Sequence, residues 1–445
     1  MRPTISWSDL RGGRIGVWGV GVEGRVNVRK LRSIDAEPVL VDDRPSEGAG
    51  EEVLATDAGG LDALERCDAV VKTPGISRYR ADVQALVARG VPVVGGLGLW
   101  LQEADRDRVV CVTGTKGKST TTSIMGHLLN QFGYRCVTGG NLGRPPYDPD
   151  LPGTADFWVI ETSSFQATDV AASPRVVAVT SLHPDHLDWH GDAETYFRDK
   201  LSLCSQPGAA ITIANGDSEL LRAHAGLLGP RTVWVGAADV GGWSDALGLR
   251  GAHNRGNAAV AVAALCELGI AAATDDRALR DAARGFEPLP SRLHTIGIVD
   301  GVEFVDDSLS TNVLPSLSAL AAFSDRPVAL IVGGYDRGID YAPLADGMSS
   351  RMAPTLVLTI PDSGPRIHAT LDDHPSSTAG AGTLEVRNCA DLAAAVHAAF
   401  TWASTDAPPR GVVLLSPAAP SFGHFRDYRD RADAFAAEMR ACRTP

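Results

Sequence analysis

Short apolar runs recur along the chain, and glycine, proline or charged residues bound them. They lie at residues 14–19, 38–42, 69–71, 109–113, 158–161, 176–180, 328–332 and 412–415. Stretches of helical character separate them, most clearly the Ala-rich residues 254–268. Strands that alternate with helices predict parallel sheets, so the pattern predicts an α/β protein.

The same pattern divides the chain into blocks. A chain of 445 residues is too long for one ordinary hydrophobic core, and its length suggests about two to four domains. We expect three domains, at residues 1–97, 98–290 and 291–445. In the last block, residues 296–305 predict a hairpin, and the Ser-, Gly- and Pro-rich residues 361–382 predict a surface loop.

Charge and cysteine usage exclude several classes of protein. The formal net charge is −13, whereas general nucleic-acid binding needs a basic face. No apolar run approaches the roughly 18 residues that a membrane-spanning helix needs. The 7 cysteines are dispersed, with no Cys-x-x-Cys pair, which fits reduced thiols better than disulfides or a zinc site. We therefore expect a cytoplasmic protein that binds neither nucleic acid nor membranes.

A loop rich in glycine and lysine is the strongest chemical signal. It lies between the apolar run 109–113 and a predicted helix, and reads Gly114-Thr115-Lys116-Gly117-Lys118-Ser119-Thr120. Its glycines let the backbone approach phosphate oxygens, and the following helix adds its positive N-terminal end. Lys118 supplies a mobile cation, and the hydroxyl of Ser119 or Thr120 can reach Mg²⁺. The alternative is a strand-to-helix turn with chance lysines. We call residues 114–120 the phosphate loop.

A second glycine-rich turn follows the first apolar run. Gly19, Gly21 and Gly24 have the spacing of a dinucleotide-binding loop, and Asp42 ends the next predicted strand. Taken alone, this pattern indicates NAD. The same tight turn serves any diphosphate, and a purely structural turn is a third interpretation.

Polar residues at the ends of two further strands are candidate metal ligands or catalysts. Glu161 could hold Mg²⁺, or the serines that follow it at 163 and 164 could simply cap a helix. The histidines and aspartates of residues 183–188 could be metal ligands, catalysts or ordinary loop groups. The local sequence around Lys200 predicts a solvated helix lysine.

Taken together and in this order, these motifs resemble those of the Mur ligase family of peptidoglycan precursor enzymes. The similarity covers nearly the whole chain. Besides the phosphate loop, it rests on these motifs: Gly140-Asn141-Leu142-Gly143, Glu161-Thr-Ser-Ser-Phe-Gln166, Asp185-His186-Leu-Asp188, His253-Asn254-Arg-Gly-Asn257, Asp307-Ser308-Leu-Ser-Thr311-Asn312, Gly333-Gly334 and Leu415-Ser416-Pro417-Ala-Ala-Pro-Ser421. Folylpolyglutamate-type ligases share the ATPase and C-terminal domains, but the glycine turn at residues 19–24 argues against them.

The resemblance implies a Rossmann-like UDP-binding domain, a central P-loop-type ATPase domain with a mostly parallel sheet, and a C-terminal Rossmann-like domain that receives an amino acid. It implies a monomeric ligase that uses ATP and two Mg²⁺ ions to join glutamate to UDP-N-acetylmuramoyl-L-alanine through an acyl phosphate. An NAD-dependent dehydrogenase and a noncatalytic nucleotide-binding regulator are the alternatives from other classes.

The resemblance also implies roles for individual residues. The expected catalytic residues are Lys118, His186 and Lys200, and the expected metal ligands are Ser119, Glu161, His186 and a carbamylated Lys200. ATP is expected to contact the phosphate loop, Asn254, Asn257, Arg292 and Asp307. The UDP substrate is expected to contact Gly19, Gly21, Gly24, Asp42, Asn141 and Gln166, and glutamate is expected to contact Thr311, Arg337, Ser421 and Tyr428.

The sequence departs from the pattern of the D-glutamate-adding enzymes where glutamate is expected to bind. Leu309 and Arg337 stand in place of two lysines, and Tyr428 stands where phenylalanine is common. An arginine re-aims a carboxylate because its planar fork binds through two N–H groups. A branch of the family adds L-glutamate and leaves the inversion of the glutamate stereocentre to a separate epimerase. The sequence of residues 18–25 resembles that branch. We expect L-glutamate, with D-glutamate as the alternative and an epimerase as a downstream partner.

Overall fold

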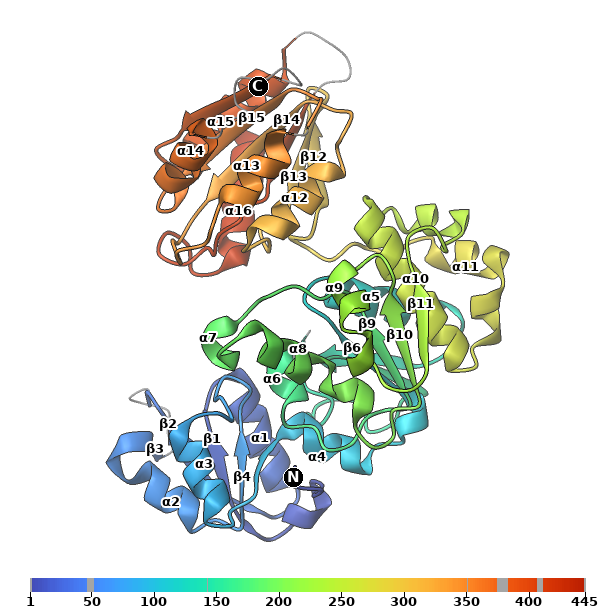
Figure 1. Ribbon diagram of the computed structural model, residues 1–445, viewed down its shortest axis with the longest axis vertical. Coiled ribbons are helices and arrows are strands. Elements are labelled where there is room, and N and C mark those ends of the chain that lie inside the picture. The colour runs from blue at the N-terminus through green and yellow to red at the C-terminus, as the bar shows by residue number, and fades with distance from the viewer. Residues whose placement is uncertain are drawn as a thin grey trace. The chain divides into compact units, whose positions relative to one another are not determined.

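The computed structural model describes residues 2–45, 52–141, 143–349, 351–373, 383–405 and 411–443, and within them three β-sheets carry helices on their faces (Figure 1). Leu142 of the expected substrate-binding motif lies outside the described residues. The chain divides into two compact units. The first unit is Met1–Gly248 with Asn254–Phe286, and the second unit is Leu249–His253 with Glu287–Pro445. The expected α/β class is confirmed.

The first sheet lies in the first unit and is parallel throughout, in the order β3-β2-β1-β4-β5. Its strands are β1 (Arg14–Trp18), β2 (Glu37–Asp42), β3 (Val53–Ala55), β4 (Ala69–Lys72) and β5 (Val93–Gly95), and the helices of this part are α1 (Val22–Ser33), α2 (Leu61–Glu65), α3 (Ala81–Ala88) and α4 (Gly96–Glu103). The strand order reverses between β1 and β4, so the carboxyl ends of these two strands flank the crevice where such a sheet binds ligands.

The second sheet also belongs to the first unit and is parallel, in the order β11-β10-β9-β6-β8-β7. Its strands are β6 (Val109–Thr113), β7 (Cys136–Gly140), β8 (Phe157–Glu161), β9 (Val176–Val179), β10 (Ile211–Asn215) and β11 (Thr232–Val235). The helices of this part are α5 (Lys118–Gln131), α6 (Ser164–Ala167), α7 (Leu187–His190), α8 (Ala193–Leu201), α9 (Glu219–Ala223), α10 (Ala252–Glu267) and α11 (Asp276–Ala283). Here the order reverses between β6 and β9.

The third sheet lies in the second unit, in the order β12-β13-β17-β14-β15-β16. Its strands are β12 (His294–Val299), β13 (Val302–Asp306), β14 (Val328–Gly333), β15 (Thr355–Ile360), β16 (Leu384–Asn388) and β17 (Val412–Leu415), and its helices are α12 (Val313–Ala321), α13 (Ala342–Ser349), α14 (Gly364–Asp372), α15 (Leu392–Ala403) and α16 (Tyr428–Ala441). β12 and β13 pair antiparallel, which confirms the predicted hairpin, and the other pairs are parallel.

The predicted surface loop at residues 361–382 is wrong in its first half, because α14 occupies part of it. Ile367 and Leu371 lie four residues apart on one helix face and are buried in the core cluster that includes Val357 of β15. This apolar spacing outweighs the loop-like composition of the surrounding residues. Residues 374–382 lie outside the described residues.

Each sheet lies within one of the three expected domain segments, but the first two sheets share one compact unit. One continuous core cluster joins them and contains Trp7 and Val17 as well as Val109 and Val177. Polar contacts add to this core: Tyr147 donates to Glu23 Oε1 at 2.9 Å. The boundaries near residues 97 and 290 therefore stay a prediction.

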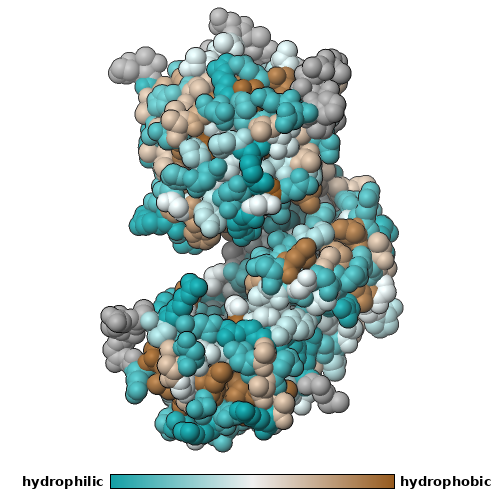
Figure 2. Space-filling model, turned by 60° about the vertical axis from the view of Figure 1, so that its left-hand side comes forward, coloured by the Kyte–Doolittle hydropathy of each residue, from teal (hydrophilic) through white to brown (hydrophobic). Residues whose placement is uncertain are grey.

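The face of the molecule in Figure 2 is largely hydrophilic, with apolar side chains in small scattered groups. None of the helices in the described part of the chain has both the length and the apolar character that crossing a membrane requires.

A buried ion pair connects the first two sheets. Lys72, which ends β4, donates to Asp169 Oδ2 at 2.5 Å, and the two side chains are only 1% and 4% exposed. Two charges so far from water are tolerated because each neutralises the other, so removal of one partner leaves the other uncompensated.

We predict that Lys72→Met lowers the free energy of unfolding by about 3 to 5 kcal/mol, because Asp169 is left as an unpaired buried charge. The double variant Lys72→Met with Asp169→Leu should recover most of this loss, since both charges are then removed. Urea unfolding of the two variants and the parent protein measures the difference. Equal destabilisation by the single and double variants would contradict the assignment.

Candidate active site

The phosphate loop lies at the point where the second sheet reverses its strand order. β6 ends at Thr113, and α5 begins at Lys118, so the predicted succession of strand, loop and helix is confirmed. The backbone N–H of Thr115 donates to Ser181 O at 2.8 Å, and that of Lys116 donates to Ser181 Oγ at 2.9 Å. The residues that follow β9 therefore hold the loop in place.

Two glycines of the phosphate loop are required by geometry. Gly114 has φ +128°, and a Cβ there would lie 2.3 Å from Thr180 Oγ1. Gly117 has φ +90°, and a Cβ there would lie 2.3 Å from Asn257 Oδ1. Both positions combine a left-handed backbone with a close neighbour, which only glycine tolerates.

Two residues expected to contact ATP lie on α10 beside the phosphate loop. Asn257 meets Gly117, as that close approach shows, and its Nδ2 donates to Asn254 Oδ1 at 3.1 Å. Both amides are buried. The fold thus brings together two motifs that are far apart in the sequence.

The loop concentrates positive charge in a protein that is acidic overall. Lys118 Nζ donates to Thr115 O at 3.1 Å, so its side chain folds back over the loop. Lys116 Nζ lies 3.4 Å from Asp185 Oδ2 and is partly exposed. Together with the N-terminus of α5, these ammonium groups favour a bound anion such as phosphate.

Glu161 ends β8 with one carboxylate oxygen engaged and one not. Oε1 accepts a hydrogen bond from Asn141 Nδ2 at 2.8 Å. Oε2 is buried and has no hydrogen-bond partner among the described residues. A buried carboxylate oxygen without a donor is costly, so this atom is suited to a bound cation.

The helix cap considered for the following serines is present. Ser163 Oγ accepts from the backbone N–H of Gln166 at 3.1 Å, and Gln166 Oε1 accepts from the backbone N–H of Ser163 at 3.0 Å. The cap uses neither oxygen of Glu161. The structural role of these residues therefore coexists with a possible metal-binding role of the carboxylate.

His186 stands at the N-cap of α7 in a left-handed conformation, with φ 53°. Its ring centroid lies 4.9 Å from that of Phe165. Burial lowers the pKa of the imidazole; the carboxylate of Asp185 opposes this shift, and the ammonium groups of Lys200 and Lys116 add to it. A neutral imidazole is the form that binds a metal or accepts a proton.

The prediction from local sequence that Lys200 is a solvated helix lysine is wrong. It is only 2% exposed, and its Nζ donates to Gly114 O at 3.0 Å beneath the phosphate loop. Burial lowers the pKa of this ammonium group well below its usual range, and the charges of Lys118 and Lys116 add to the effect. The helix α8 turns this residue inward, so it is not a solvated lysine.

The glycine turn of the first sheet is tightly packed. A Cβ on Gly24 would lie 1.9 Å from Gly19 O, and one on Gly19 would lie 2.2 Å from Thr73 Oγ1, whereas Gly21 has open space. Asp42 Oδ2 accepts from the backbone N–H of Val20 at 2.7 Å. Asp42 therefore braces the turn in addition to any contact with a ligand.

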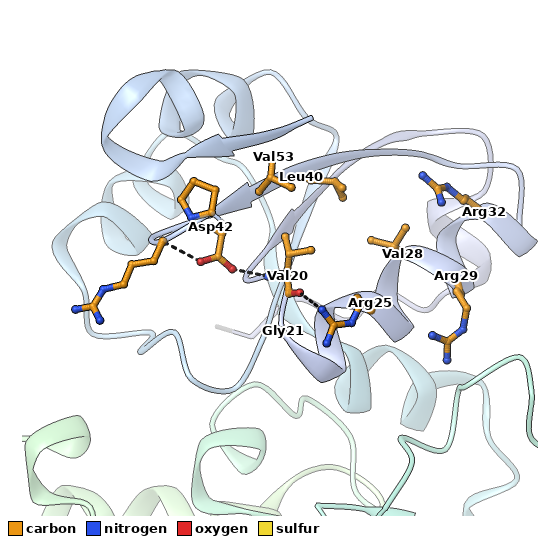
Figure 3. Close-up of a pocket in the computed structure, with 11 residues that line it drawn as sticks. Val20, Gly21, Arg25, Val28, Arg29, Arg32, Leu40, Asp42 and Val53 are labelled. Carbon is orange, nitrogen blue, oxygen red and sulfur yellow. Dashed lines mark hydrogen bonds between the residues drawn. The ribbon is translucent and has the colours of Figure 1, made fainter. Parts of the chain in front are cut away.

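A cavity of about 500 Å³ lies beside this turn and includes Gly21 and Asp42 in its wall. Figure 3 shows Arg25, Arg29 and Arg32 along α1 on one side of it and Asp42 on the other. The sequence reasoning missed these arginines. Their spacing of four and three residues, which places them on one helix face, was the available signal.

Gln166 lies near the same glycine turn. Burial raises the pKa of Glu23 at the start of α1, and the hydrogen bond from Tyr147, the charge of Lys72 and a hydrogen bond with Gln166 oppose that rise. Gln166 of α6 thus connects the first and second sheets. The residues expected to hold the two ends of a UDP-linked substrate lie within one compact unit.

The remaining expected ATP contacts belong to the second unit. Asp307 is buried and accepts from Ser310 Oγ at 2.5 Å and from Ser416 Oγ at 2.6 Å. Burial raises the pKa of Asp307 to about 6 in spite of these hydrogen bonds. The backbone N–H of Leu293 also donates to Asp307, so the segment that carries Arg292 lies beside it.

A fully buried arginine organises the expected glutamate site and was missed from the sequence. Arg431 Nη2 donates to Ser308 O at 2.7 Å and to Ala419 O at 3.2 Å, which joins the loops that carry Thr311 and Ser421. Burial lowers the pKa of Arg431 to about 10. The signal available was its position four residues before the apolar Phe435 on the buried face of α16.

The other expected glutamate contacts lie nearer the surface. Arg337 is exposed, whereas Tyr428 and Leu309 are half-buried. A small cavity of about 70 Å³ is lined by residues that include Ser421 and Arg431. Arg431 therefore joins the two loops on which Thr311 and Ser421 lie, while Arg337 lies at the surface of the second unit.

The donor set in the first unit fits a hard divalent cation. The described residues contain no cluster of three or more His, Cys, Asp or Glu side chains that could hold a metal by itself. The open oxygen of Glu161 and the hydroxyl of Ser119 are the oxygen ligands that Mg²⁺ accepts, and phosphate and water supply the rest in most such sites.

Comparison with known proteins agrees with this geometry. Residues 112–244 match the family model described as the Mur ligase middle domain. The chain is 40% identical over 466 residues to the UDP-N-acetylmuramoyl-L-alanine–L-glutamate ligase of Xanthomonas oryzae pv. oryzae, an alignment that covers 96% of this chain and 95% of that protein. It is 41% identical over 459 residues to the ligase of the same name from Micromonospora sp., with 97% and 98% covered.

A solved structure shows the same fold. The UDP-N-acetylmuramate–alanine ligase of Thermotoga maritima superposes with a TM-score of 0.55 at 17% identity, covering 96% of this chain and 99% of that one. Identity above a third over nearly the full length of both proteins, together with the matched middle domain, establishes the relationship that the motifs predicted. The chain belongs to the Mur ligase family.

Proposed function

We propose that this protein is an ATP-dependent ligase that joins L-glutamate to UDP-N-acetylmuramoyl-L-alanine in peptidoglycan precursor synthesis. The observation that carries the proposal is the phosphate loop with its two lysines at the end of β6, together with the unpartnered oxygen of Glu161 on the neighbouring strand β8. The names of the relatives from Xanthomonas and Micromonospora support this substrate pair. They lend no support to an NAD-dependent dehydrogenase.

The chemistry follows from the poor reactivity of a carboxylate toward amines. A carboxylate oxygen of the alanyl group attacks the γ-phosphorus of ATP, the bond to the bridging oxygen breaks, and ADP leaves. The amine of glutamate then attacks the carbonyl carbon of the acyl phosphate, loses a proton, and displaces inorganic phosphate. Both steps depend on positioning and on neutralising the phosphate charge.

The residues of the phosphate loop would supply this neutralisation. Lys118 would contact the transferring phosphoryl group, and the N-terminus of α5 would stabilise the neighbouring phosphates. Asn254 and Asn257 would contact the nucleotide from α10. Arg292 and Asp307 are also proposed to contact the nucleotide.

Glu161, His186 and Ser119 would hold Mg²⁺, two ions by analogy with the family. When bound, Mg²⁺ supplies positive charge to the phosphate oxygens. Asn141 donates to Oε1 of Glu161, whereas Oε2 has no hydrogen-bond partner among the described residues and is available for this purpose.

Lys200 would act after modification by carbon dioxide. Burial lowers the pKa of its ammonium group and so favours the neutral amine, which is the form that can attack carbon dioxide to give a carbamate and a proton. The modification would turn a buried cation beneath the phosphate loop into a carboxylate, which could then share in holding the metal. Nothing in the local sequence favours this chemistry, whereas the burial does.

The second unit would select the amino acid. Thr311 and Ser421 would contact glutamate on a frame set by Arg431, and Arg337 and Tyr428 would complete the site. The D-glutamate enzymes have a lysine where this chain has the uncharged Leu309. A carboxylate of glutamate must therefore bind another cation, and we propose Arg337 for this role. This displacement supports L-glutamate.

The cellular setting follows from the same chemistry. An L-glutamate product requires a separate epimerase that acts on it afterwards, and we propose such an enzyme as the downstream partner. All 7 cysteines are free thiols, which suits the reducing cytoplasm where ATP is available. We propose that the protein acts there as a monomer.

We predict that Lys118→Ala lowers kcat for ligation by about 10²-fold to 10³-fold or more, because it removes a charge aimed at the transferring phosphoryl group. Phosphate release in the presence of both substrates measures the rate. Lys30→Ala, which changes a lysine on α1 away from the loop, is the matched control and should retain full activity. Substantial turnover by a folded Lys118→Ala variant would refute the assigned role.

We predict that the purified protein with UDP-N-acetylmuramoyl-L-alanine and ATP forms an amide with L-glutamate and not with D-glutamate. The physical reason is the changed placement of cations at Leu309 and Arg337. Mass spectrometry of the product and phosphate release with each enantiomer measure the preference. A clear preference for D-glutamate would reject the stereochemical part of the proposal, and no reaction with either would reject the ligase itself.

A further inference from the structure

Four side chains form a continuous hydrogen-bonded chain close to the candidate active site. The hydroxyl of Tyr79 donates to Asp199 at 2.8 and 2.9 Å, one distance to each carboxylate oxygen. Asp199 Oδ2 lies 2.7 Å from His190 Nδ1, and His190 Nε2 lies 3.0 Å from Ser164 Oγ. We call this set the Tyr79–Ser164 chain. Asp199, His190 and Ser164 are buried, and Tyr79 is 47% exposed.

The direction of the first two hydrogen bonds follows from chemistry. A carboxylate only accepts, so His190 must carry a proton on Nδ1, and Tyr79 must keep its hydroxyl proton. Burial and the hydrogen bond to Asp199 raise the pKa of Tyr79 to about 12, which keeps that proton in place. The imidazole is thereby fixed in orientation between Asp199 and Ser164.

The order serine, histidine, aspartate also occurs in hydrolases, but the burial here excludes that use. Ser164 is 2% exposed, and His190 is 4% exposed. A nucleophile needs access to its substrate, which Ser164 lacks. The function of the chain must therefore lie in what it holds together.

Each buried member of the chain shares a short segment with one proposed metal-holding residue. Ser164 begins α6 three residues after Glu161, the last residue of β8. His190 and His186 stand at the two ends of α7, and Asp199 and Lys200 are neighbours on α8. One imidazole thus joins the three segments that carry the proposed metal site.

The same imidazole also contacts the phosphate loop through one intermediate. Its ring lies edge-on to Tyr196 with centroids 5.2 Å apart. The hydroxyl of Tyr196 lies 2.9 Å from Thr115 Oγ1 in the phosphate loop. Any displacement of His190 would therefore affect the loop as well as the three short segments.

The outer end of the chain belongs to the loop that follows β4 in the first sheet. Trp189 Nε1 donates to Gly75 O at 3.3 Å, and Ser77 Oγ donates to Trp189 O at 3.3 Å. Arg78 also donates to Thr168 O. This loop flanks the crevice of the first sheet, where the UDP end of the substrate is expected.

We propose that the Tyr79–Ser164 chain is a positioning device that sets the relative places of Glu161, His186 and Lys200 and couples them to the loop after β4. The coupling to ligation rests on the proposed function. The positioning of the metal-holding groups does not, and binding alone can test it. Partners that orient metal ligands from behind contribute about 10-fold to 100-fold to metal affinity or activity.

The first experiment uses Tyr79→Phe, which removes one hydroxyl at a partly exposed residue. The expected results are an about 10-fold weaker affinity for Mn²⁺ in the presence of a nonhydrolysable ATP analogue, an about 10-fold lower kcat, and an unchanged KM for glutamate. Electron paramagnetic resonance measures free Mn²⁺, and Tm should stay within a few degrees of the parent. Tyr134→Phe, on the connection between α5 and β7, is the matched control and should change neither quantity.

The second experiment separates positioning from packing at His190. In His190→Asn the amide can replace Nδ1 as donor to Asp199, whereas His190→Ala replaces neither nitrogen. The expected result is weaker Mn²⁺ binding in both folded variants, with His190→Asn the closer to the parent. The double variant Tyr79→Phe with Ser164→Ala should weaken Mn²⁺ binding by less than the product of the two single-variant factors, because both substitutions interrupt the same chain.

The proposal is overturned if Tyr79→Phe and His190→Asn both bind Mn²⁺ with the parent affinity. It is also overturned if they lower only Tm, with kcat per folded molecule unchanged, since the chain would then be merely structural. A parent protein that releases no phosphate with glutamate would defeat the proposed function instead, and the Mn²⁺ titrations would still decide the positioning.

Discussion

The hydrogen bonds between the phosphate loop and the residues after β9 are the constraint on which the candidate site depends. Ser181 accepts hydrogen bonds from the backbone N–H groups of Thr115 and Lys116, and Gly114 and Gly117 supply the left-handed turns of the same loop. The loop is thus fixed before any ligand binds, so binding need not order it. Because β6 and β9 are the strands between which the sheet reverses, this place also lies open to a ligand.

Local signals in the sequence were sufficient for the parts of the protein that depend on near neighbours. The phosphate loop follows from glycine and lysine spacing between a strand and a helix, and the hairpin around Asp300 follows from its turn. The parallel sheets follow from the alternation of apolar runs with helical stretches. The ends of strands also marked Glu161 and Asp42, because parallel strands gather their carboxyl ends at one edge.

Features that depend on distant packing were beyond the reach of local sequence. Lys200 reads as a surface lysine because only the fold places Gly114 O above its amine. Arg431 resembles an ordinary helix residue in the sequence, yet it joins the loop that contains Ser308, 123 residues away, to the loop that contains Ala419, 12 residues away. The role of His190 likewise arises from Ser164 and Asp199, which lie on separate helices.

The central claim is that the phosphate loop serves to make an acyl phosphate on the substrate carboxylate. The most direct measurement places ¹⁸O in both oxygens of the alanyl carboxylate of UDP-N-acetylmuramoyl-L-alanine and follows the label into the products. An acyl phosphate sends one labelled oxygen into the released inorganic phosphate and keeps the other in the new amide. Inorganic phosphate without label, while the amide still forms, would contradict this account of the site.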